Sequence, residues 1–142
     1  MALTLFVNFN GNCREAVDFY TQVFGTEAPK FMTFGEAPPD PQAAPLPEAA
    51  KNLIMYTQLD IGGTILMFSD IFPGTPFVAG NNITLTVGSK DMEEIKTLFD
   101  KMKVGGMVTM ELQETFWSKS FGSVIDKFGI PWMFSHDSGW TM

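Results

Sequence analysis

The stretch LTLFVNFNGNCREAVDFYTQVFG, residues 3–25, decides the fold, because a stretch of the same kind, ITLTVGSKDMEEIKTLFDKM, follows at residues 83–102. Each stretch begins with alternating apolar residues, as in a half-buried strand, and continues with apolar residues at helical spacing. The two copies lie about 80 residues apart, and such a repeat indicates a duplicated structural unit. Strand patterns follow each helix, so the sequence predicts two copies of an α+β unit.

The first helix is expected over Cys13 to Phe24. Asn12 and Glu15 stand three residues apart, which is the spacing of a capping box at a helix N-terminus. Gly25 follows the last apolar residue, as is typical where a helix ends.

The second helix is expected over Asp91 to Met102, with Ser89 or Asp91 as its cap. Asp60 to Gly63 lies between two apolar runs and predicts a hairpin turn. The strands expected after the two helices are Lys30–Phe34, Leu53–Leu59, Thr64–Ser69, Val108–Gln113, Phe121–Ile125 and Pro131–Ser135.

We expect a single domain, 1–142, built from two modules at about 1–72 and 82–137, with a linker at 73–81. Residues 35–50 hold five of the nine prolines, which excludes a central strand or a helix interior there. This proline-rich excursion is either a lid or a mobile connector. The tail, 137–142, is expected to fray.

The composition narrows the possible partners. The net charge is −7, so phosphate backbones and anionic lipids are repelled, and neither nucleic acid nor a membrane is an expected partner. No basic leader with a small-residue cleavage site and no membrane-length apolar run is present in the sequence. A single cysteine agrees with a reducing compartment. We therefore expect a cytoplasmic protein.

Three strings carry a family resemblance: NFNGNCREAVDFYTQVFG (8–25), LDIGGTILMFSD (59–70) and LQETFWSKSFGSVIDKFGIPWMF (112–134). They resemble the PhnB-like branch of the vicinal oxygen chelate superfamily, also labelled 3-demethylubiquinone-9 3-methyltransferase-like. The superfamily includes glyoxalase I, extradiol dioxygenases and bleomycin resistance proteins. The resemblance implies two βαβββ modules that form a U-shaped mixed sheet around a cavity, in a homodimer.

The resemblance also implies where a divalent metal would be bound in the enzymatic members. The four positions fall at Thr4 or Leu5, Met67, Asn82 and Met133. These residue types are poor ligands for zinc, nickel or iron, so we expect neither a metal nor another cofactor. The carboxylates of Asp60 and Asp70 at strand ends are read as solvated turn residues, and the only histidine, His136, as a surface residue.

Candidate binding residues lie on the predicted strands and in the segment that follows the strand Val108–Gln113. Glu114 and Trp117 follow a strand and combine a carboxylate with a large ring, which suits a pocket wall. In an apolar cleft the pKa of Glu114 would rise, making it a candidate catalytic base; the alternative is a solvated Glu114, or one paired with Lys119 or Lys127. The candidate ligand-binding residues are Asn8, Tyr56, Gln58, Met67, Glu114, Trp117, Phe121 and Trp132.

Each candidate has a structural alternative. The aromatic residues 116, 117, 121 and 132 could instead close the sheet or form a dimer contact, and the polar side chains of Asn8, Tyr56 and Gln58 could lie on an outer, wet face. Cys13 has no placed imidazole partner and is read as an ordinary buried thiol. No glycine-rich phosphate loop links a strand to a helix, so a nucleotide-binding fingerprint does not support the methyltransferase label.

The leading hypothesis is a metal-free homodimer that binds an unidentified small molecule. The alternative is a glyoxalase-type isomerase or lyase that uses Glu114 with an unconventional metal site. A second alternative is a dimeric structural or interaction protein. The sequence leaves open whether the protein is an enzyme, and it does not show which face of each strand lines a cavity.

Overall fold

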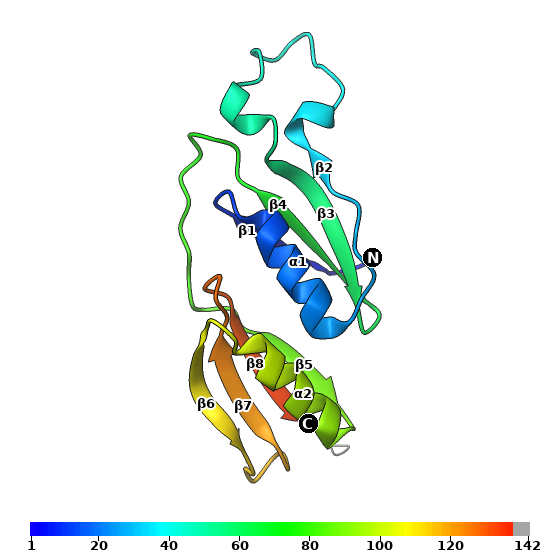
Figure 1. The fold of residues 1–142 in the computed structure, drawn as a ribbon, viewed down its shortest axis with the longest axis vertical. Coiled ribbons are helices and arrows are strands. Elements are labelled where there is room, and N and C mark those ends of the chain that lie inside the picture. Colours follow the sequence, from blue (N-terminus) through cyan, green and yellow to red (C-terminus); the bar gives the residue numbers. More distant parts are fainter. Residues whose placement is uncertain (138–142) are drawn as a thin grey trace. The chain divides into compact units, whose positions relative to one another are not determined.

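The computed structural model describes residues 1–137, so residues 138–142 of the expected frayed tail lie outside the described part. The chain divides into two compact units, Met1–Phe77 and Val78–Met142 (Figure 1). Within the described residues, no helix has the length and apolarity that crossing a bilayer requires.

Unit 1 has the order strand, helix and three strands that the sequence predicts. Its sheet has the strand order β1-β4-β3-β2, in which β1 pairs with β4 in parallel and β3 pairs with both β4 and β2 in antiparallel fashion. Two short 3-10 helices, Phe34–Glu36 and Glu48–Ala50, lie in the proline-rich excursion. The elements are β1 (Leu5–Phe9), α1 (Cys13–Phe24), β2 (Met32–Thr33), β3 (Ile54–Ile61) and β4 (Thr64–Asp70).

Unit 2 repeats this topology. Its sheet has the order β5-β8-β7-β6, again with a parallel pair (β5 and β8) and two antiparallel pairs. The elements are β5 (Leu85–Ser89), α2 (Met92–Met102), β6 (Met107–Gln113), β7 (Phe121–Ile125) and β8 (Pro131–His136). The structure therefore confirms the predicted α+β fold, which consists of two βαβββ modules.

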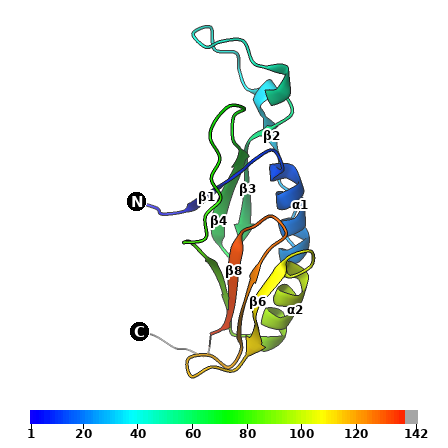
Figure 2. The same ribbon diagram turned by 90° about the vertical axis from the view of Figure 1, so that its left-hand side faces the viewer.

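The helix α1 covers one face of the sheet of unit 1, and α2 covers one face of the sheet of unit 2 (Figure 2). Tyr20 of α1 packs against Phe68 of β4 with ring centroids 5.9 Å apart, and both side chains are buried. Phe99 of α2 packs edge-on against Phe134 of β8 at 5.8 Å. Because side chains alternate along a strand, the residues on either side of Phe68 and Phe134 point away from the helix.

The first helix is capped differently from the prediction. The Asn12 side chain makes no capping hydrogen bond, so the predicted capping box is wrong. Instead the Cys13 backbone N–H donates to Asp70 Oδ1 at 2.9 Å, and the Ile54 N–H donates to Asp70 Oδ2 at 2.9 Å. Asp70 is only 3% exposed, which corrects its reading as a solvated turn residue.

The second helix is capped locally, as the sequence predicts. Asp91 Oδ1 accepts hydrogen bonds from the backbone N–H groups of Glu93 and Glu94, at 2.9 and 3.3 Å. Ser89 Oγ in turn accepts from the Asp91 N–H at 3.1 Å. The two copies thus satisfy the orphan N–H groups of a helix N-terminus with a remote carboxylate in unit 1 and a neighbouring one in unit 2.

Candidate functional site

The helix-free face of the unit 1 sheet brings together four of the predicted ligand-binding residues. Thr57 and Leu59 of β3 are buried, whereas Tyr56 and Gln58, which alternate with them along the strand, are exposed. Phe68 of β4 points to α1, so Met67 points to the opposite face. We call this helix-free surface of β1, β3 and β4 the open face of unit 1.

The strand register sets the neighbours on the open face. Met67 of β4 lies opposite Phe6 of β1 on one side and Gln58 of β3 on the other. Residues directly opposite one another in a sheet share a face, so these three side chains form one row. In the next row Asn8 lies opposite Ser69.

Polar and aromatic contacts order these side chains. The Tyr56 hydroxyl donates to Gln58 Oε1 at 2.6 Å, and Ser69 Oγ donates to Asn8 Oδ1 at 3.0 Å. The ring of Phe6 is tilted against that of Tyr56, with centroids 6.4 Å apart. The open face therefore combines two rings, a thioether and two carboxamides, and Phe6 and Tyr56 remain substantially exposed.

The corresponding face of unit 2 carries related residues. Met133 of β8 lies opposite Thr86 and Ser123, as Met67 lies opposite Phe6 and Gln58 in unit 1. Carrying the same registers along the strands makes Phe121 the counterpart of Tyr56. The duplication therefore places an aromatic residue and a methionine at matching positions of both helix-free faces.

A short aromatic series adjoins the unit 2 face. The Trp117 ring packs edge-on against Phe121 at 5.3 Å and against Phe116 at 4.7 Å. The Phe116 side chain is 97% exposed. Hydrogen bonds between Thr115 and Ser118 hold the turn that presents these rings, since the Thr115 N–H donates to the Ser118 carbonyl at 2.8 Å.

Trp132 and Glu114 are also predicted ligand-binding residues, but their surroundings differ from those of the residues above. Trp132 is 2% exposed in the core, because it alternates in phase with Phe134, and its Nε1–H donates to Asp126 Oδ2 at 2.8 Å. Glu114 follows β6 and is exposed, so burial does not desolvate its carboxylate.

The positions at which the resemblance implies a metal do not offer a suitable ligand set. Met67 and Met133 present thioethers on the helix-free faces, while Asn82 is exposed ahead of β5. Thr4 donates its hydroxyl to the Ile65 carbonyl, and Leu5 is apolar. Among residues 1–137, no group of three or more His, Cys, Asp and Glu side chains is arranged to hold a metal ion.

The histidine and the cysteine are both tied into the framework. His136, read from the sequence as a surface residue, is half-buried on β8, where Nε2 contacts the Lys90 carbonyl at 2.9 Å. Cys13 is fully buried at the start of α1, as expected. Burial, reinforced by the Asp70 carboxylate and opposed by the Arg14 guanidinium, raises the pKa of Cys13 from 9.0 to about 12. The thiol therefore stays protonated and is a poor nucleophile.

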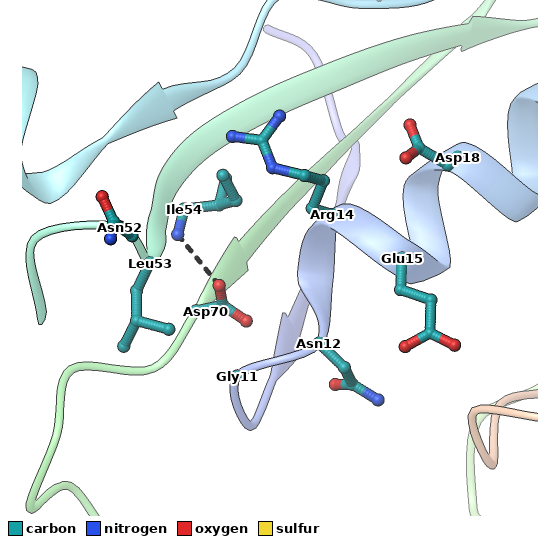
Figure 3. Close-up of a pocket in the computed structure, with 9 residues that line it drawn as sticks. All are labelled: Gly11, Asn12, Arg14, Glu15, Asp18, Asn52, Leu53, Ile54 and Asp70. Atoms are coloured by element: carbon teal, nitrogen blue, oxygen red, sulfur yellow. Dashed lines mark hydrogen bonds between the residues drawn. The ribbon is translucent and has the colours of Figure 1, made fainter. Parts of the chain in front are cut away.

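An open pocket of about 450 Å³ lies elsewhere in unit 1, at the N-terminus of α1 (Figure 3). Of the carboxylates around it, Asp70 is occupied by two backbone N–H groups. The Arg14 guanidinium lies 4.4 Å from the centroid of the Phe31 ring. None of the predicted ligand-binding residues lines this pocket, whose lining consists of Gly11, Asn12, Arg14, Glu15, Asp18, Asn52, Leu53, Ile54 and Asp70.

Sequence reasoning missed two residues that organise unit 1. Phe6 lies between Leu5 and Val7, and its apolar ring on the otherwise polar side of β1 was the signal for an open-face contact. Asp70 gave no such signal, because its two hydrogen-bond partners are distant in sequence.

Comparisons with known proteins agree with this architecture. A family model described as 3-demethylubiquinone-9 3-methyltransferase matches residues 1–135. Protein YjdN of Escherichia coli (strain K12) is 35% identical over 141 residues, covering 94% of this chain and 93% of that protein.

Solved structures extend the comparison. Protein PA1353 from Pseudomonas aeruginosa has 32% identity and a TM-score of 0.82, with 96% of this chain and 97% of that one covered. A putative 3-demethylubiquinone-9 3-methyltransferase, PhnB protein, from Bacillus cereus has 25% identity and a TM-score of 0.72, covering 96% and 99%. A glyoxalase-related enzyme from Fulvimarina pelagi shares the fold at 17% identity and a TM-score of 0.64, covering 100% and 93%.

Proposed function

Because the chain belongs to the 3-demethylubiquinone-9 3-methyltransferase family of PhnB-like proteins, which has the glyoxalase/bleomycin resistance fold, we propose that it binds a small molecule without using a metal ion. The observation that carries the proposal is the convergence of Asn8, Tyr56, Gln58 and Met67 on the open face of unit 1. An apolar surface with a few oriented polar groups is the usual make-up of a small-molecule site.

The residue types favour binding over metal chemistry. Thioethers at Met67 and Met133 fill positions where enzymatic members of the superfamily are expected to hold imidazole or carboxylate. Methionine is flexible and polarizable, and it adapts to varied apolar partners. On unit 2 we propose that Trp117 and Phe121 contribute stacking surface, and that the exposed Glu114, three residues before Trp117 in the chain, supplies a polar contact.

Binding at the open face is tested by labelling the methionine methyl groups with ¹³C and titrating a library of planar small molecules. We expect the Met67 methyl resonance to shift with binders, and Tyr56→Ala to weaken them about fivefold or more, as loss of a ring contact of roughly 1 kcal/mol predicts. The Met92 methyl on α2 is the internal control. The proposal fails if Met67 never moves, or moves no more than Met92 does.

The absence of metal chemistry has its own test. Purified protein is analysed for bound transition ions, and ligand titrations are repeated after treatment with a chelator. We expect no stoichiometric metal and unchanged binding. A tightly held ion whose removal abolishes binding would contradict the proposal and favour the glyoxalase-type alternative.

We also propose that the protein is a cytoplasmic homodimer. Exposed apolar side chains of unit 2, among them Ile83, Val104 and Met107, support association, and the presence of a single cysteine, the buried Cys13, agrees with a reducing compartment. Light scattering after size exclusion tests the first point, since a monomeric mass at micromolar concentration would refute the dimer. Cell fractionation tests the second.

A further inference from the structure

On the open face of unit 1, the carboxamide oxygens of Gln58 and Asn8 already accept hydrogen bonds, which leaves the NH₂ groups of the same side chains as donors. Gln58 Oε1 accepts from Tyr56, and Asn8 Oδ1 accepts from Ser69. Each carboxamide also carries an NH₂ group with two donors. Within residues 1–137, neither of these NH₂ groups donates a hydrogen bond to the protein. What this surface presents to a ligand is therefore N–H groups.

The charges near these N–H groups indicate whether a neutral or an anionic acceptor on the ligand is favoured. The strands β1, β3 and β4 contain no lysine, arginine or histidine. Asp60, two residues beyond Gln58 on β3, is exposed, and its Oδ1 accepts from the Gly63 N–H at 2.9 Å. The net charge of the chain is −7. A carboxylate or phosphate ligand would therefore meet a repulsive field with no cation on these three strands to offset it.

The apolar neighbours define the body of the ligand. Phe6 and Tyr56 present two exposed rings, and Met67 lies between Phe6 and Gln58 in the same row. Aromatic rings and thioethers make favourable contacts with planar rings. The amide of Gln58 thus lies at the edge of a surface suited to a flat molecule.

We propose that the open face of unit 1 selects a neutral, planar ring compound that carries a carbonyl oxygen. The carbonyl accepts from the Gln58 or Asn8 amide N–H, and the ring packs on Phe6, Tyr56 and Met67. This inference rests on the proposed binding function and adds the chemical class of the ligand.

Four single-ring probes, titrated into the native protein, separate the contribution of a carbonyl group to affinity from the contributions of charge and of the ring. Acetophenone carries a carbonyl, ethylbenzene has a CH₂ in its place, benzoate is an anionic acceptor and benzylammonium is a cationic donor. Affinities come from the shift of the Met67 methyl resonance. We expect acetophenone to bind about three- to tenfold more tightly than ethylbenzene, the effect of one net hydrogen bond, and more tightly than benzoate.

The variant Gln58→Glu tests how much the N–H donor of Gln58 contributes to ligand binding. Glutamate keeps an oxygen for the Tyr56 hydroxyl but has no N–H group, so the ring contacts remain in place. We expect it to lose most of the preference for acetophenone over ethylbenzene and to gain affinity for benzylammonium. Gln22→Glu on α1 makes the same charge change on the helix side of the sheet and serves as the matched control. Asn8→Asp tests the second amide in the same way.

The outcomes distinguish this inference from the function on which it rests. If ethylbenzene or benzoate shifts Met67 with an affinity equal to that of acetophenone, the carbonyl inference is wrong while binding at this face stands. The inference is also wrong if Gln58→Glu and Asn8→Asp both leave the probe order unchanged. If no probe or library member shifts Met67, both proposals fall together.

Discussion

The carboxylate of Asp70, at the end of β4, accepts a hydrogen bond from the backbone N–H of Cys13. Cys13 lies 57 residues earlier in the chain, at the start of α1. Its second oxygen accepts the Ile54 N–H, where β3 begins. One buried side chain thus joins a helix to two strands. Hydrogen bonds to a charged acceptor contribute more to stability than those between neutral groups, so this residue has a large structural role in unit 1.

Replacing Asp70 is expected to destabilise the protein strongly. Asp70→Ala leaves two backbone N–H groups without their acceptor, and we expect a loss of about 2–5 kcal/mol in the free energy of unfolding, measured with urea. Asp70→Asn keeps one amide oxygen and should lose less. Asp60→Ala is the control, because exposed Asp60 accepts only a turn N–H. Equal losses for Asp70→Ala and Asp60→Ala would refute this role.

Cys13 makes stability depend on alkaline pH. Its pKa is 9.0 when unperturbed and about 12 in the folded protein, so above pH 9 the unfolded chain releases the thiol proton while the folded protein retains it. Stability from this group is present below pH 9 and is lost as the pH rises toward 12, by about 1 kcal/mol per pH unit. Urea unfolding at pH 8 and pH 10 measures the loss.

The variant Cys13→Ala controls for the lysines and tyrosines that titrate in the same range. The wild-type and variant stabilities should converge as pH rises, because only the wild type loses the thiol contribution. Parallel curves would show that the thiol titrates alike in both states. In native protein at pH 8, the buried thiol should also react with iodoacetamide much more slowly than in urea.

Most of the fold was predictable because its signals are local. The apolar spacing of residues 13–24 gave α1 with its correct bounds, and the Gly62–Gly63 turn lies where the hairpin was predicted. The capping box failed because a carboxylate 57 residues away took the role of Asn12. A contact between distant segments depends on the folded arrangement, and sequence spacing does not reveal it.

The candidate site was predictable only in part, for a related reason. Period-two alternation put Tyr56 and Gln58 on one strand face, but only the position of α1 shows that this face is the open one. The same alternation on β8 puts Trp132 beneath the helix and Met133 on the other side. Composition alone does not distinguish a core tryptophan from one that is available to a ligand.

Gly122 on β7 is required by close packing. A Cβ at this position would lie 3.0 Å from Phe99 Cε2, 3.0 Å from Leu112 Cδ2 and 3.0 Å from the Met110 carbonyl oxygen. Gly122→Ala should therefore destabilise by about 1–3 kcal/mol through overpacking. Gly88→Ala on β5 is the matched control, because its Cβ would approach only the Ser135 carbonyl oxygen, at 3.9 Å. Thermal unfolding of both variants is the measurement, and comparable transition temperatures would contradict the packing argument.

The aromatic residues of unit 2 should separate into structural and surface roles. Trp132→Phe removes a buried indole whose N–H donates to the Asp126 carboxylate, and we expect a loss of about 2–4 kcal/mol. Phe116→Ala removes a ring that is 97% exposed, and we expect a change within about 0.5 kcal/mol. Urea unfolding measures both. If Phe116→Ala destabilises as much as Trp132→Phe, the exposed ring is packed in solution, and the separation argued here is wrong.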